Sequence, residues 1–139
     1  MTRARIVIGT GLAVLAAMWL GMQYFVWEPS SIPRGSLYAL KVPAAAKNQH
    51  VWNAVGTPLY DVRLGDRPSP AYTLVRYAAS GGTERLERAI AADGFDCQRI
   101  EPGSISCDRR RDGALDMQVV AQYEFAADAS RVTVHIPQY

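Results

Sequence analysis

The longest apolar run of the chain lies near its N-terminus, at Ile6–Trp27, and contains no charged side chain in 22 residues. As a helix rising about 1.5 Å per residue it would extend roughly 33 Å, enough for a bilayer core of about 30 Å. Arg3 and Arg5 precede the run, and basic residues beside a first span favour the cytoplasmic side. The pattern predicts a transmembrane anchor at residues 6–27, a cytoplasmic segment at residues 1–5, and the remainder of the chain outside.

A cleaved signal peptide is the alternative interpretation of this run. Its apolar core would be about 7–15 residues long and would end at a small-x-small site, for which Val14 and Ala16 are weak candidates. Cleavage there would leave an exposed apolar head, so an uncleaved anchor is the expectation.

Small residues at a spacing of four form one strip on the expected helix, where another helix could approach closely. They are Gly9, Ala13, Ala17 and Gly21.

Residues 28–70 form a proline-rich arm with six of the eight prolines. Proline lacks a backbone donor and disfavours helix at the residue before it, so the arm is expected to be extended. It is also rich in apolar side chains, unlike a disordered linker, and therefore needs a surface to lie on. Short edge strands are expected at Leu37–Val42 and Leu59–Leu64.

A compact domain is expected at residues 71–139, beginning with a strand at Tyr72–Tyr77. Thr83 is a candidate N-cap for a short helix at Glu84–Asp93, and Gly94 suits the left-handed position that ends it. Two further strands are expected at Phe95–Ile100 and Ile105–Arg110.

The two cysteines, Cys97 and Cys107, face each other if these two strands pair around Pro102-Gly103. An even pair in an oxidising compartment predicts a disulfide. The next strand alternates clearly from Met117 to Phe125. A three-residue loop at 111–113 would match its apolar face to the preceding strand by pairing Cys107 with Met117.

The last strand is expected at Arg131–Pro137, pairing Tyr123 with Val134 and Phe125 with Val132. The predicted fold class is thus α+β: a transmembrane helix, then an antiparallel meander of four or more strands with one helix packed on its apolar face. The other face would be polar, and it would carry Gln98, Ser106, Gln118, Gln122, Glu124, Thr133 and His135.

The charge balance argues against nucleic-acid binding. The net charge is +2, and Arg3 and Arg5 account for it, which leaves the rest of the chain neutral. Phosphate recognition needs a basic excess. The one basic run, Arg109–Arg111, lies among aspartates and is expected at a solvated hairpin tip.

Catalytic and cofactor motifs are missing. His50 lies in a polar stretch and His135 on the polar face, and neither is near an obvious nucleophile. The sequence has no phosphate-binding glycine loop and no zinc or haem spacing. We therefore expect no enzymatic activity, no cofactor and no metal.

The order of basic head, apolar span, proline-rich stretch and cysteine-bearing domain resembles small membrane-tethered envelope proteins of bacteria in general. The expected location is the inner membrane, single-pass, with the domain in the periplasm. The expected function is a non-catalytic accessory subunit of a membrane complex. Its partners would be membrane lipids and the transmembrane helices of other subunits, or a second copy. The alternative is a tethered binding module for a peptide, lipid or envelope polymer.

Overall fold

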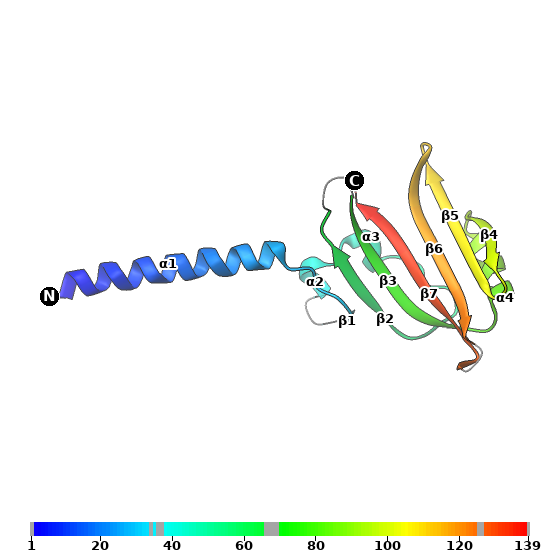
Figure 1. Ribbon diagram of the computed structural model, residues 1–139, viewed down its shortest axis with the longest axis horizontal. Helices are drawn as coiled ribbons and strands as arrows, with labels where there is room; N and C mark the ends of the chain where they lie inside the picture. Colours follow the sequence, from blue (N-terminus) through cyan, green and yellow to red (C-terminus); the bar gives the residue numbers. More distant parts are fainter. Residues whose placement is uncertain (1, 34, 36–37, 66–69, 125–126, 139) are drawn as a thin grey trace.

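The computed structural model describes residues 2–33, 35, 38–65, 70–124 and 127–138, and it forms one long sheet with a projecting helix (Figure 1). The helices are α1 (Thr2–Val26), α2 (Tyr38–Lys41), α3 (Ala44–Lys47) and α4 (Thr83–Ala92). The strands are β1 (Ile32–Pro33), β2 (Ala54–Arg63), β3 (Ala71–Ser80), β4 (Asp96–Glu101), β5 (Ser104–Arg111), β6 (Ala114–Glu124) and β7 (Ala129–Gln138).

All seven strands belong to one antiparallel sheet in the order β1-β2-β3-β7-β6-β5-β4. The predicted fold class, a transmembrane helix followed by an antiparallel meander of four or more strands, is therefore corrected: the described residues form a seven-stranded antiparallel sheet, and none of their helices can span a membrane. Strands β4 to β7 do form a meander, but β7 then pairs with β3 along its whole length, from Ala71 opposite Gln138 to Ser80 opposite Ala129. Strands β1 and β2 extend the sheet beyond β3, so residues from the proline-rich arm lie in the same sheet.

Helices α3 and α4 cover one face of the sheet, which carries the core. Leu86 and Ile90 of α4 are fully buried against the inward side chains of β5 and β6, as the amphipathic spacing predicts. The indole of Trp52 packs edge-on against the ring of Phe95, with the ring centroids 5.5 Å apart. Its Nε1 donates to Asp93 Oδ2 at 2.7 Å, so the loop before β2 is bonded to the end of α4.

The apolar N-terminal run is a helix, α1, as its composition predicts. Within the part of the chain that the structure describes, however, no helix combines the length and apolarity needed to cross a membrane. This finding overturns the predicted transmembrane anchor at Ile6–Trp27. The location predicted from it, a single-pass protein of the bacterial inner membrane, is corrected with it.

The two strands expected in the arm had different outcomes. Leu59–Leu64 falls largely within the strand β2, as predicted, and its Tyr60 and Val62 are buried. Beyond β2 the sheet ends in the two-residue strand β1, which pairs with Leu59 and Tyr60. The stretch expected as a strand at Leu37–Val42 contains the short helix α2 instead, and Leu37 itself lies outside the described residues. A Pro at position 43 ends this helix because the residue before a proline avoids helical backbone.

Helix α4 matches its prediction within one residue at each end. Gly82, rather than Thr83, is the N-cap, and Thr83 is the first residue of the helix. Gly94 follows the helix with a φ of 85°, the left-handed conformation expected of it.

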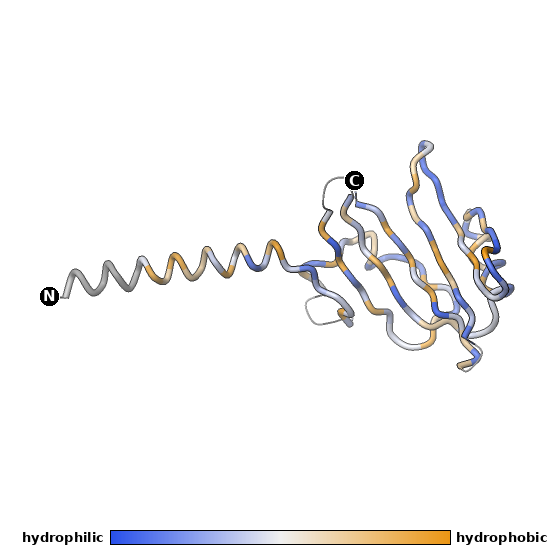
Figure 2. Tube along the Cα trace, viewed as in Figure 1, coloured by the Kyte–Doolittle hydropathy of each residue, from blue (hydrophilic) through white to orange (hydrophobic). Residues whose placement is uncertain are grey.

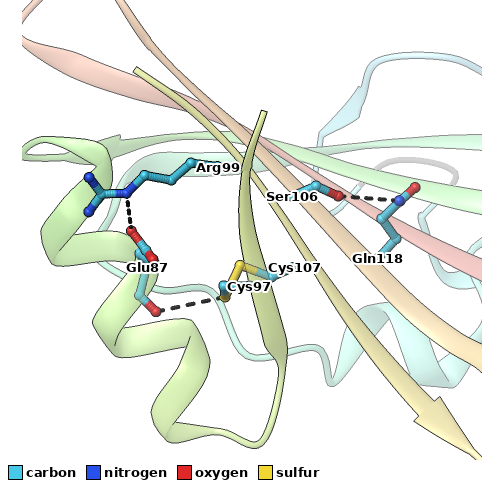
Figure 3. Close-up of a disulfide and its surroundings, with 6 residues drawn as sticks. All are labelled: Glu87, Cys97, Arg99, Ser106, Cys107 and Gln118. Carbon is cyan, nitrogen blue, oxygen red and sulfur yellow. Dashed lines mark hydrogen bonds and ion pairs between the residues drawn. A yellow bond between two sulfur atoms is a disulfide. The ribbon is translucent and has the colours of Figure 1, made fainter. Parts of the chain in front are cut away.

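The β4–β5 hairpin has the predicted register, with Cys97 directly opposite Cys107 and a disulfide between them (Figure 3). The bridge lies on the same side of the sheet as α4. Arg99 of β4 reaches back to this helix, and its Nε lies 3.1 Å from Glu87 Oε2. Ser106 and Gln118 lie on the opposite face, where Gln118 donates to the Ser106 hydroxyl at 3.3 Å.

The β5–β6 turn differs from its prediction. Its two central residues, Asp112 and Gly113, both have positive φ, at 53° and 82°, which is the pattern of a two-residue type I′ turn. The turn alone would pair Cys107 with Gln118. A register shift beside Arg109 moves the pairing by one further residue, so that Cys107 lies opposite Val119, two residues from the predicted Met117. The bulge restores the match of apolar faces that the turn alone would break.

The register of β7 on β6 is also corrected. Val134 lies opposite Val119 and Val132 opposite Ala121, which is four residues from the predicted pairing. An even shift keeps each side chain on its expected face, so Val132, Val134 and Ile136 are buried as predicted. The predicted partner of Val132, Phe125, lies outside the described residues.

Candidate functional site

Helix α1 is the most exposed apolar surface of the described chain, and it projects from the end of the sheet where β1 lies (Figure 1). Its apolar side chains are exposed around the helix rather than on one side, and Figure 2 shows mostly apolar colouring on the part of the helix that it colours by hydropathy. They are Leu12, Val14, Leu15, Met18, Trp19, Leu20, Met22, Tyr24, Phe25 and Val26. Exposed apolar patches of this extent are typical of surfaces that contact another molecule.

The predicted small-residue strip lies on this helix. Ala13 and Ala17 are exposed, and a Cβ built on Gly21 would have no atom within 4 Å. Nothing in the described chain therefore packs over this part of the strip. The side-chain surroundings of Gly9 lie outside what the structure describes.

The C-terminal end of α1 is bonded to the rest of the chain through α2. Lys41 of α2 donates from Nζ to the backbone oxygen of Tyr24 at 2.6 Å, and the same Nζ lies 4.3 Å from the centre of the Tyr24 ring. A cation at this position also complements the negative end of the helix dipole.

The segment after α1 is bonded to β2. Glu28 accepts the backbone N–H of Leu64 at 2.9 Å and pairs with Arg63 at 3.1 Å, while the oxygen of Pro29 accepts the N–H of Val62 at 3.0 Å. The bonds from Arg63 and Leu64, in that order, lower the pKa of Glu28 below its ordinary value. These contacts fix where α1 leaves the sheet.

A second ion pair holds β1 and the turn before it. Asp61 is only 5% exposed, and its carboxylate lies 2.7 Å from Nε of Arg76 on the neighbouring strand. It also accepts the backbone N–H of Ser31, and Arg76 Nη2 donates to the Ser31 hydroxyl at 2.9 Å. Ser31 has a positive φ of 53°, which these bonds stabilise.

The face of the sheet opposite the core, called the open face below, carries a row of polar side chains across β7, β6, β5 and β4, with Leu74 of β3 at one end of the row. Register places Leu74, His135, Gln118, Asp108 and Asp96 side by side on β3, β7, β6, β5 and β4. The predicted polar face is therefore present, with His135 near its centre. The His135 ring stacks on Tyr72 with centroids 4.6 Å apart, and burial lowers the pKa of the imidazole.

The ring contacts that the structure shows for the two histidines are with aromatic side chains. His50 lies in an exposed loop against the edge of Trp52, and His135 contacts Tyr72 on the open face. Among the described residues, no group of three or more histidine, cysteine or acidic side chains could hold a metal ion. The absence of enzymatic activity remains a prediction.

Sequence reasoning did not find the residues that bond α1 and β1 to the sheet: Glu28, Lys41, Asp61, Arg63 and Arg76. Each pair is separated by many positions, and no periodicity links its members.

The basic run at the β5–β6 turn is part of a local ion pair, as its acidic surroundings suggest, with Arg109 Nη2 2.8 Å from Asp116.

Comparisons with protein-family models, with curated proteins and with solved structures find no match to this chain.

Proposed function

We propose that the chain is a non-catalytic accessory subunit that joins a larger protein assembly through α1, packing this helix against apolar helices of a partner protein. The observation that carries the proposal is the exposed apolar surface around α1. Packing against a partner would remove this apolar surface from water, and each Å² removed contributes roughly 25 cal/mol of favourable free energy.

The chemistry of α1 favours a helical partner. Gly11–Val26 has no charged side chain and so offers no ion pairs for specificity. Ala13, Ala17 and Gly21 instead provide a shallow strip where a second helix backbone can approach, with larger side chains on both sides. Such an interface gains most of its energy from close packing, which a larger side chain in the strip would prevent.

The bonds at the base of α1 support a structural role. Lys41 holds its last turn, and Glu28 and Pro29 bond the following segment to β2. A helix fixed in this way would place the sheet in a defined position on the assembly.

The test compares two matched substitutions in the full chain, Ala17→Leu in the strip and Ala16→Leu on another side of the helix. Both add the same side chain to α1. A photo-crosslinking residue in place of Met18, an exposed large side chain beside the strip, identifies the partner segment of each variant by mass spectrometry, and size separation gives the size of the assembly. We expect Ala17→Leu to abolish a crosslink to an apolar helix of the partner and to release the chain, while Ala16→Leu retains both.

Equal behaviour of the two variants would overturn the helix-packing proposal. So would a full chain that runs alone, or one whose α1 inserts into phosphatidylcholine vesicles without any protein partner.

The second candidate function is a binding module that uses the open face of the sheet. The observation favouring it is a cavity of about 310 Å³ on that face, between β2, β3 and β7. This function would be retained by variants of α1, which distinguishes it from the first.

A further inference from the structure

The cavity on the open face originates from an irregularity in β2. Val55 lies opposite Ala78 and Leu59 lies opposite Arg76, so three residues of β2 face only Tyr77 on β3. Within this stretch Gly56 has a φ of 82°, and Pro58 has no N–H to donate. The backbone of β2 therefore departs from regular pairing here, and the cavity of about 310 Å³ lies at this position.

The lining of this cavity combines an apolar part with two guanidinium groups. Leu59, Ala78 and Ala129 supply apolar surface, Thr57 supplies a hydroxyl, and Arg76 and Arg131 supply the charges. Register places Arg131 directly opposite Ala78, while Arg76 precedes Ala78 by two residues on the same face of β3. The small alanine side chain thus leaves space between two arginines.

Arg76 is held in position before any ligand arrives. Its Nε and Nη2 contact the nearly buried Asp61, and Nη2 also donates to Ser31. In the described part of the chain, none of the bonds to Arg76 uses Nη1, which leaves two N–H donors of a fixed guanidinium. The Arg76 side chain is 40% exposed, so these donors can be reached.

Arg131 is paired more loosely. Its partner is Glu124, and the two side chains are 68% and 40% exposed. An ion pair this exposed contributes little to stability, so a ligand carboxylate can replace Glu124 at small cost. The lining holds Arg76, Arg131 and Glu124, and Asp61 beside Arg76 brings the local charge to zero, so a ligand carboxylate would take the place of the Glu124 carboxylate at Arg131.

We propose that this cavity binds a carboxylate attached to a short aliphatic group. The carboxylate would accept from Arg131 and from the unused donors of Arg76, a planar arrangement that guanidinium groups favour. The aliphatic group would lie on Leu59, Ala78 and Ala129. Two sources offer this chemistry, a free branched-chain carboxylic acid and the C-terminus of a peptide ending in valine. The inference specifies the second candidate function and is independent of the role of α1.

The test follows backbone amide signals by NMR in the full ¹⁵N-labelled chain during titration with three probes. These are isovalerate, the peptide Ac-Ala-Ala-Val with a free C-terminus, and the same peptide with a C-terminal amide. We expect saturable shifts at Ala78, Ala129 and Arg131 with at least one of the two carboxylates and not with the amide. Binding of isovalerate points to the free acid, and binding of the peptide alone points to a chain terminus.

Two substitutions test the residues. Arg131→Gln is expected to weaken carboxylate binding about tenfold or more, because a hydrogen bond to a charged group is lost. Arg110→Gln, at the far end of β5, is the matched control and should bind as the unmodified chain does. Ala78→Leu should block the cavity while retaining Arg131.

The carboxylate inference and the binding-module function on which it rests are contradicted by different results. If the amidated peptide binds as well as the free peptide, the carboxylate inference is overturned and the binding module stands. If neither carboxylate causes saturable shifts at 10-fold and 100-fold excess, or if Arg131→Gln binds like the unmodified chain, the inference is likewise overturned.

Discussion

Glu28 lies 3.1 Å from Arg63 across the edge of the sheet, and this ion pair joins the segment that follows α1 to the end of β2. The same carboxylate accepts the N–H of Leu64, so one side chain makes both a charged and a backbone contact. Because the segment is short, these two bonds set the place where the helix leaves the sheet.

The Glu28–Arg63 contact predicts a pH-dependent junction. Arg63 first and the Leu64 N–H second lower the pKa of Glu28 below its ordinary value of 4.5. The stabilisation is therefore complete above pH 4.5 and is lost as the pH falls through the lowered pKa. A ¹³C NMR titration of the Glu28 carboxyl should give a midpoint below 4.5 that rises in Arg63→Gln. An unchanged midpoint in that variant would show that the ion pair contributes nothing.

The disulfide predicts a defined loss of stability on reduction. Cys97 and Cys107 are separated by 10 positions, and closing a loop of this size is worth about 2–3 kcal/mol. Urea unfolding with and without reductant should differ by this amount. The double variant Cys97→Ala, Cys107→Ala should be unaffected by reductant, and its stability should resemble that of the reduced chain. A reductant effect that persists in the double variant would contradict this account.

The β5–β6 turn predicts a backbone requirement at Gly113. Its φ of 82° is strained for a residue with a Cβ, so Gly113→Ala should lower the free energy of unfolding by about 1 kcal/mol or more. Gly113→Asn is the matched control, because asparagine tolerates left-handed backbone better than alanine does. Equal losses in the two variants would show that the turn conformation is not what limits this position.

This turn also shows how far alternation determines a sheet. The period of two places Val119, Val132 and Val134 on the buried face, and that much was predictable. Register was not, because a shift of four residues in β7 leaves every face unchanged, and the bulge beside Arg109 offsets the one-residue error of the turn. The β4–β5 register was predictable because Cys97 and Cys107 mark it.

The contacts at the base of α1 and beside the cavity on the open face could not be predicted from the sequence, for a different reason. Asp61, Arg76 and Ser31 meet only once β1, β2 and β3 are adjacent, and their spacing along the chain has no period. The assignment of α1 as a membrane span followed from length and apolarity counted along the sequence, and no helix among the described residues meets both conditions.

His135 predicts a second pH effect, on the stability of the sheet itself. Its ring stacks on Tyr72, and its neighbour on β6 is the uncharged Gln118, with Asp108 one strand further away. Burial lowers the pKa of His135 below 6.5, so the unfolded chain binds a proton more readily than the folded chain. Stability is therefore unaffected above pH 6.5 and falls as the pH drops from 6.5 toward the lowered pKa.

The measurement is the thermal unfolding midpoint at pH 7.5 and pH 5.5 in the unmodified chain and in His135→Gln. The midpoint should drop more in the unmodified chain, because the variant has no imidazole to protonate at this position while the carboxylates and His50 are common to both. His50→Gln is the control, and it should retain the full drop. If His135→Gln loses as much stability between the two pH values as the unmodified chain, protonation of His135 does not oppose folding.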